Sequence, residues 1–219
     1  MVLRSILEQH AGIVMDRQHF LGELLGEHEW GADTESGQFF FDGPGIETPF
    51  EVIGTVSHQT GEWLWAWANS SLPGKLAAIS RKLQEYGIEH GIERFTQERF
   101  APEDADLHAI GIAACALGDA RAYYIADYGD GALLAVFPEG SFMDAWQADH
   151  MRVFTVFSAL IQMFDLDHRP TLEAYLAALG YEIRTENGLA ANRGKDALHA
   201  SFDAQGRLAR LKGGGDKFS

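Results

Sequence analysis

The sequence predicts an α+β protein, mainly antiparallel sheet with packed helices, plus a small C-terminal αβββ unit. Apolar residues recur at three- and four-residue spacing over several segments, as amphipathic helices require. The β-type runs are short and follow one another across Gly, Pro, Asn and Asp residues, which favours hairpins over βαβ units. The composition, with 46% hydrophobic residues in a chain of 219, is sufficient for a buried core.

The first half of the chain is expected to open on a helix and to continue as hairpins. Apolar residues keep helical spacing from Leu3 to Leu25, and Gly12 is the position at which this helix could divide into two. The segment Gln59-Thr60-Gly61 is expected to be a hairpin turn, and Pro73 and Gly91 flank a later helix. The expected elements are a helix over 3–25, strands over 38–42, 49–57 and 62–69, and a helix over 74–90.

The second half is expected to divide into the end of a main domain and a small appendage. The opening Ala101-Pro102-Glu103-Asp104 places Pro and acids in a first helical turn, where they are favourable. The polar segment 165–170 marks the boundary between a main domain, 1–165, and an αβββ appendage, 166–219. The expected elements are helices over 101–118, 150–163 and 171–179, and strands over 123–125, 132–137, 181–185, 197–202 and 207–211.

The charge is strongly negative and unevenly distributed. Of the net −15, residues 1–149 carry 24 Asp/Glu against 8 Lys/Arg, and residues 150–219 carry 8 against 9. Such a field repels nucleic acid and anionic lipid and steers a basic partner protein toward the molecule, although an acidic surface is also a common solubility device. We therefore expect neither a nucleic-acid partner nor a membrane partner.

Cysteine usage and hydropathy bear on the compartment. The single cysteine, Cys115, lies in an apolar run, so neither an intrachain disulfide nor a Cys-based zinc site is possible. The N-terminal segment lacks an apolar stretch of signal-peptide type, and no apolar run has membrane-spanning length. These observations predict a soluble, cytoplasmic protein.

The most distinctive local feature is the alternation of Trp63, Trp65 and Trp67 with small or aliphatic residues. On one strand the three indoles would project from the same face. That face is either part of the core, because aromatic side chains dominate core energetics, or an aromatic groove for a ligand or partner peptide. The candidate binding residues are Trp63, Trp65, Trp67, His58, Glu62 and Asn69.

No arrangement of titratable residues predicts a metal or cofactor. Asp104, Asp106 and His108 are two residues apart on an expected helix, so their side chains cannot converge on one ion. His19 and Glu23 share a helical face but lack the zinc-protease pattern. The phosphate-loop, dinucleotide-binding and nucleophile-elbow motifs are absent from the sequence. We therefore expect no cofactor and no metal ion.

Five stretches stand out together: Gly26-Glu27-His28-Glu29-Trp30, the Trp-rich hairpin 61–69, residues 83–92, Ala122-Tyr123-Tyr124 and His168-Arg169-Pro170. They resemble a bacterial family known only as a domain of unknown function, over nearly the whole chain. Residues 140–152 are longer than the family pattern. The resemblance implies no catalytic residue.

Two hypotheses for function follow. The first is a non-catalytic binding protein, of the immunity or antitoxin type, that uses an acidic face against a basic partner protein. The second is a hydrolase with a His/carboxylate site near the Trp-rich hairpin, for which His28, His58, Glu62 and Asn69 are the candidates. The first hypothesis is favoured because the sequence carries no catalytic signature.

Overall fold

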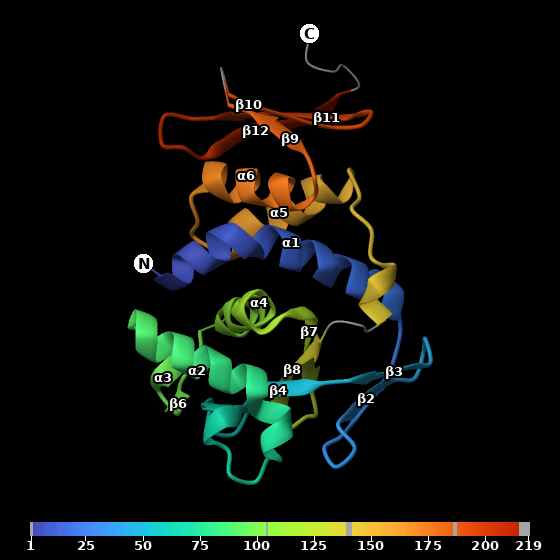
Figure 1. Cartoon of the computed structure of the whole chain (residues 1–219), viewed down its shortest axis with the longest axis vertical. Coiled ribbons are helices and arrows are strands. Elements are labelled where there is room, and N and C mark those ends of the chain that lie inside the picture. The colour runs from blue at the N-terminus through green and yellow to red at the C-terminus, as the bar shows by residue number, and fades with distance from the viewer. Residues whose placement is uncertain (1, 104, 139–141, 186–187, 215–219) are drawn as a thin grey trace. The chain divides into compact units, whose positions relative to one another are not determined.

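The computed structural model describes residues 2–103, 105–138, 142–185 and 188–214, and it confirms the α+β class (Figure 1). The α-helices are α1 (Val2–Leu25), α2 (Ala78–His90), α3 (Glu93–Thr96), α4 (Asp106–Gly118), α5 (Arg152–Met163) and α6 (His168–Ala178). Short 3-10 helices are η1 (Ala66–Ala68), η2 (Gly74–Ala77) and η3 (Phe142–Ala145).

The strands form three antiparallel sheets within the described residues. The first sheet has the order β1-β2-β3 and comprises β1 (Trp30–Asp33), β2 (Gln38–Phe41) and β3 (Ile46–Pro49). The second has the order β6-β5-β4-β8-β7 and comprises β4 (Glu51–Ser57), β5 (Trp63–Trp65), β6 (Arg99–Phe100), β7 (Ala120–Asp127) and β8 (Gly131–Pro138). The third has the order β12-β11-β10-β9 and comprises β9 (Glu182–Arg184), β10 (Leu189–Arg193), β11 (Asp196–Phe202) and β12 (Leu208–Gly214).

The chain divides into two compact units, and each is described separately. The central unit comprises residues 17–146, and the C-terminal unit comprises residues 3–16 with residues 147–219. The first part of α1 therefore belongs to the C-terminal unit and its remainder to the central unit. The expected boundary between residues 165 and 166 falls inside the C-terminal unit.

In the central unit, α4 packs closely because its glycines leave no side chain in the way. A Cβ at Gly111 would lie 2.7 Å from the ring of Tyr123 on β7, and one at Gly118 would lie 2.4 Å from Ile79 on α2. Residues Ala109 to Cys115 are all buried. Burial raises the pKa of the Cys115 thiol to about 12, so this cysteine is an inert core residue.

The C-terminal unit is a four-stranded sheet with helices on one face (Figure 1). Its core is built from the apolar faces of α5 and α6 and from alternate residues of β10 and β11, such as Leu189, Ala191 and Leu198. The sequence predicted three strands here, and the structure corrects this number to four. Strand β10 was missed because its Leu-Ala-Ala-Asn-Arg sequence has few residues that favour strands.

A buried charged cluster joins the three helices of the C-terminal unit. The Asp16 side chain on α1 is fully buried, accepts a 2.5 Å hydrogen bond from the Tyr175 hydroxyl on α6, and lies 3.4 Å from Nη1 of Arg152 on α5. Burial and then the Asp16 charge raise the pKa of Tyr175. Gly12 does not break α1. A Cβ there would lie 2.3 Å from Tyr175, so this glycine permits α1 and α6 to approach.

Among the described residues, no helix combines the length and apolar character that crossing a bilayer requires.

Candidate functional site

The Trp-rich segment is a strand only as far as Trp65. β5 pairs with β4 in the predicted hairpin, with Val56 opposite Trp63 and Gly54 opposite Trp65, and the turn contains Gly61 at a φ of 69°. Residues 66–68 then form the 3-10 helix η1, in which the Trp67 backbone N–H donates to the Ser80 hydroxyl. The expectation of three indoles on one strand face is therefore wrong, because the strand ends before Trp67.

Trp63 and Trp65 face the core. Both side chains are 0% exposed, and their rings meet edge to face with centroids 5.5 Å apart. The indole N–H of Trp65 donates to the carbonyl of Arg94, whereas the indole N–H groups of Trp63 and Trp67 find no acceptor in the described part of the chain. The Trp63 ring lies over Gly54, where a Cβ would be 2.2 Å from the ring. These two indoles thus form no open groove.

The other candidate residues have separate surroundings. His58 lies between two turns, with Nδ1 3.0 Å from the Gly129 carbonyl and Nε2 3.8 Å from Asp127. Glu62 is exposed and directly follows the turn that joins β4 to β5. The Asn69 side chain accepts a hydrogen bond from the Ser71 backbone N–H, which makes it a turn residue. A role for these residues in binding or hydrolysis stays a prediction.

His28 is held elsewhere, at the entry to β1. Its Nδ1 lies 2.9 Å from the Gly26 carbonyl and its Nε2 lies 2.8 Å from the Tyr124 hydroxyl. A carbonyl only accepts hydrogen bonds, so Nδ1 donates to Gly26, and Nε2 lies within hydrogen-bond distance of the Tyr124 hydroxyl. These bonds fasten the chain beside β7. His28 and His58 therefore have different hydrogen-bond partners.

The residues considered as metal ligands in the sequence have separate partners in the structure. Asp106 pairs with Arg94 at 3.3 Å, His108 lies 2.8 Å from the Tyr123 hydroxyl, and Asp104 falls outside the described residues. His19 and Glu23 lie 3.4 Å apart on the solvent side of α1. The described residues contain no cluster of three His, Cys, Asp or Glu side chains with the geometry of a metal site.

The outer face of the β1-β2-β3 sheet was not identified from the sequence. Phe39 and Phe41 on β2 are 0% exposed, so the alternation of the strand directs Phe40 to the opposite, outer face, where it is half-buried. The strand register places Gly31 and Glu47 on either side of Phe40, and a Cβ at Gly31 would lie 4.0 Å from the Phe40 ring. An aromatic ring therefore stands at the centre of this sheet face.

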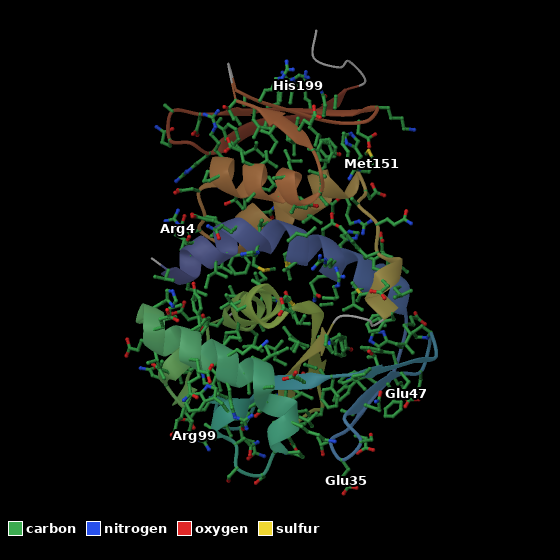
Figure 2. All side chains as sticks on the ribbon, in the orientation of Figure 1. Arg4, Glu35, Glu47, Arg99, Met151 and His199 are labelled. Carbon is green, nitrogen blue, oxygen red and sulfur yellow. The ribbon has the colours of Figure 1, made fainter. Side chains whose placement is uncertain are left out.

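Exposed carboxylates surround that ring. Glu47 on β3 lies directly opposite Phe40. Glu29 and Asp42 form the pair just beyond β1 and β2, where the Asp42 N–H donates to the Glu29 carbonyl, and all three carboxylates are exposed. Glu35 lies at the tip of the β1-β2 hairpin, and Figure 2 shows both Glu35 and Glu47. We call Phe40 with Glu29, Asp42 and Glu47 the acidic face.

The surrounding sequence gives the acidic face almost no compensating charge. Residues 18–74 contain nine Asp or Glu and no Lys or Arg. Lys75 follows directly, but its amine donates to the Glu35 carbonyl at the hairpin tip. Asp33 at the same turn accepts hydrogen bonds from the Ser36 hydroxyl and from two backbone N–H groups, which lower its pKa. The local field on this face is therefore negative.

The acidic face stands on a rigid support. Beneath it, Phe39 and Phe41 pack against one another with centroids 5.0 Å apart, and both meet Phe137 and Tyr124 edge to face. Phe39 also stacks on Trp30. Such pairs fix side-chain positions beyond what area burial alone does. Two signals in the sequence could have indicated this face: three consecutive phenylalanines on one expected strand, which cannot all face the core, and the absence of Lys and Arg from residues 18–74.

Comparison with known protein families gives a match over most of the first two thirds of the chain. A family model described as a family of unknown function, DUF6882, matches residues 4–138. The match includes the Trp-rich hairpin and the stretches at 26–30, 83–92 and 122–124, but it ends before His168, so the resemblance is shorter than expected. No curated protein and no solved structure matches the chain.

Proposed function

The chain belongs to the DUF6882 family, whose function is unknown, and we propose that it is a non-catalytic binding protein. Its acidic face binds a basic partner protein, in the manner of an immunity or antitoxin factor. We place this activity in the cytoplasm, where a single buried thiol such as Cys115 needs no disulfide partner.

One observation carries the proposal: the half-buried ring of Phe40 stands at the centre of an acidic face, and the segment that forms this face, residues 18–74, contains no Lys or Arg. Protein interfaces concentrate their binding energy in central aromatic anchors surrounded by a polar rim. Complementary charge raises the rate of encounter and excludes partners of the same sign. Phe40 and its carboxylates have this arrangement.

The size of the face defines its role. Three strands of four residues cover about 200 Å², from strand spacings of about 4.8 Å and rises of about 3.3 Å per residue. A stable interface of standard size needs about 800 Å² on each partner. The acidic face therefore supplies the centre of an interface, and the partner also contacts the turns around it, including the hairpin tip at Glu35.

The experiment compares two triple variants with equal changes of charge. Glu29→Gln, Asp42→Asn and Glu47→Gln neutralise the acidic face, and Glu85→Gln, Glu89→Gln and Glu98→Gln neutralise three exposed carboxylates elsewhere in the central unit. The immobilised chain is exposed to source-cell lysate at low salt, the retained protein is identified, and the purified protein is titrated against each variant.

We expect the chain to capture a basic protein. Its affinity should fall at least about tenfold for the face variant and less than about threefold for the control variant, because salt screens charges that lie more than a Debye length from the bound partner. Phe40→Ser should weaken binding further with no change of net charge. An equal loss of affinity in both triple variants would show that binding depends on net charge alone, and this would contradict a role for the acidic face. A captured protein that is acidic, or no saturable binding by the purified protein, would refute the proposal.

A further inference from the structure

The outer face of the sheet in the C-terminal unit carries two cationic side chains, Arg210 and Lys212, on the edge strand β12. The strand register places Ala190, His199 and Lys212 side by side on β10, β11 and β12, and Ser201 beside Arg210 in the next row. Their neighbours Ala191, Leu198 and Ala200 face the helices and are buried, so this row faces away from the core. Figure 2 shows His199 on the side of the sheet opposite α6.

These side chains line a shallow cavity of about 390 Å³. Its floor includes the small residues Ala190 and Ser201, while Arg210 and Lys212 on β12 form one side. Both cations are exposed, and neither has a hydrogen bond or ion pair with another described residue. We call Ser201, His199, Arg210 and Lys212 the basic groove.

Carboxylates lie only at the margins of this face in the described chain. Glu182 lies opposite Asn192 on the edge strand β9. It is two strands away from His199 and two residues out of register with it. Asp203 is in the β11-β12 turn, and its carboxylate accepts two backbone N–H groups of that turn. The groove is therefore a positive patch on a protein of net charge −15.

The contrast between local and total charge selects the class of ligand. A long polyanion would extend past Glu182 and Asp203 at the margins of this face, which would repel it, whereas a compact anion contacts the groove alone within a Debye length of about 8 Å. The guanidinium of Arg210 matches a phosphate in a two-point fork, and Lys212, Ser201 and His199 add donors from the same face.

We propose that the basic groove is a binding site for a small phosphate-bearing ligand, held by Arg210 and Lys212 over His199 and Ser201. The cavity volume is at the low end of the range of small-molecule sites. This site is independent of the acidic face, since it lies in the other unit and outside the residues matched by the family model.

The test uses inorganic phosphate and phenyl phosphate as probes, with acetate as the anion for comparison. Backbone and His199 side-chain resonances are followed by NMR during titration of the full chain. We expect saturable shifts at β11 and β12 with both phosphates at millimolar concentration and no saturation with acetate. Arg210→Ala with Lys212→Ala should weaken binding at least about tenfold, because charge-assisted hydrogen bonds are lost.

Two further variants keep the interpretation specific. Lys195→Ala with Arg207→Ala removes the same charge from exposed turns of the same unit and should leave the affinity within about twofold, because these residues lie outside the groove lining. Arg210→Lys keeps the charge but loses the fork, so its affinity should fall between wild type and the double variant. An amide spectrum that changes only near the substituted positions shows that each variant is folded.

Four results would overturn the proposal. They are the absence of saturable shifts with either phosphate, an equal loss in the Lys195/Arg207 control, tighter and strongly salt-dependent binding of single-stranded RNA, and a concentration-dependent dimer that covers β11 and β12. The last two would identify a nucleic acid or a second copy as the occupant of this face.

Discussion

In the central unit, residues 17–146 carry 21 Asp or Glu against 7 Lys or Arg, whereas residues 3–16 and 147–219 together carry 11 against 10. The cores also differ. The central unit encloses an aromatic cluster around Phe39 and Phe41, while the C-terminal unit encloses a charged cluster of Asp16, Arg152 and Tyr175. The central unit therefore carries a large excess of negative charge and an aromatic core, whereas the C-terminal unit is nearly neutral overall and holds an ion pair in its core.

The largest expected effect comes from breaking the buried cluster of the C-terminal unit. Asp16→Ala leaves the guanidinium of Arg152, whose side chain is 10% exposed, without its buried carboxylate, and it deprives Tyr175 of its acceptor. We expect a loss of about 3–5 kcal/mol in the free energy of unfolding, measured with urea. Asp167→Ala removes an exposed ion pair with Arg4 and should cost much less than Asp16→Ala, because solvent screens this pair. Similar losses in both variants would contradict the distinction.

The aromatic core of the central unit can be tested with one substitution at two neighbouring positions. Trp65→Phe removes the hydrogen bond to the Arg94 carbonyl, whereas Trp63→Phe removes an indole N–H that has no acceptor in the described chain. The lost ring area is the same. Trp65→Phe should therefore be more destabilising than Trp63→Phe by about 1–2 kcal/mol in thermal or urea unfolding. The reverse order would show that packing around Trp63 dominates.

Each unit holds one deeply buried tyrosine, and alkaline pH should affect both units. Burial raises the pKa of Tyr123, and burial with the Asp16 charge raises that of Tyr175. In the unfolded chain both titrate near pH 10, so the stability they contribute is present below about pH 10 and is lost as pH rises above it. Tyrosinate absorbance should report the two groups only as the chain unfolds. Tyr175→Phe removes one of the two titrating groups and should reduce the slope of stability against pH above about pH 10. An unchanged slope would contradict the assignment to Tyr175.

The smallest effects on stability are expected at the two charged surfaces. The triple variant of the acidic face and the double variant Arg210→Ala with Lys212→Ala change exposed side chains only, so each should alter the free energy of unfolding by less than about 0.5 kcal/mol. Urea unfolding of both variants measures this. A larger loss would mean that the surface is structural, and the binding experiments would then need the single substitutions.

Much of the fold was predictable from local pattern. The helical spacing of residues 3–25 and the hairpin turn at 59–61 were confirmed, because each depends on neighbours in sequence. The end of β5 was not predictable, since it is set by the Ser80 hydroxyl on α2, which binds the Trp67 N–H. The alternation of tryptophans continued in the sequence after the strand had ended.

The two candidate surfaces differ in how far sequence could lead to them. The acidic face left a signal in one continuous segment, the stretch 18–74 without Lys or Arg. The basic groove left none, because His199 and Lys212 are separated by a turn and meet only through the register of β11 and β12. Strand register depends on pairing across the sheet, which a single sequence does not specify.

The stretch without Lys or Arg has a consequence for protein chemistry. A protease that cleaves after these residues has no site between Arg17 and Lys75, so its digestion leaves the whole β1-β2-β3 sheet, the Trp-rich strand and the acidic face in one fragment. Amine-reactive cross-linkers likewise find no lysine on that fragment before Lys75. A partner on this surface is therefore better mapped with proteases that cleave at Glu, Asp or aromatic residues and with cross-linkers that react with carboxylates.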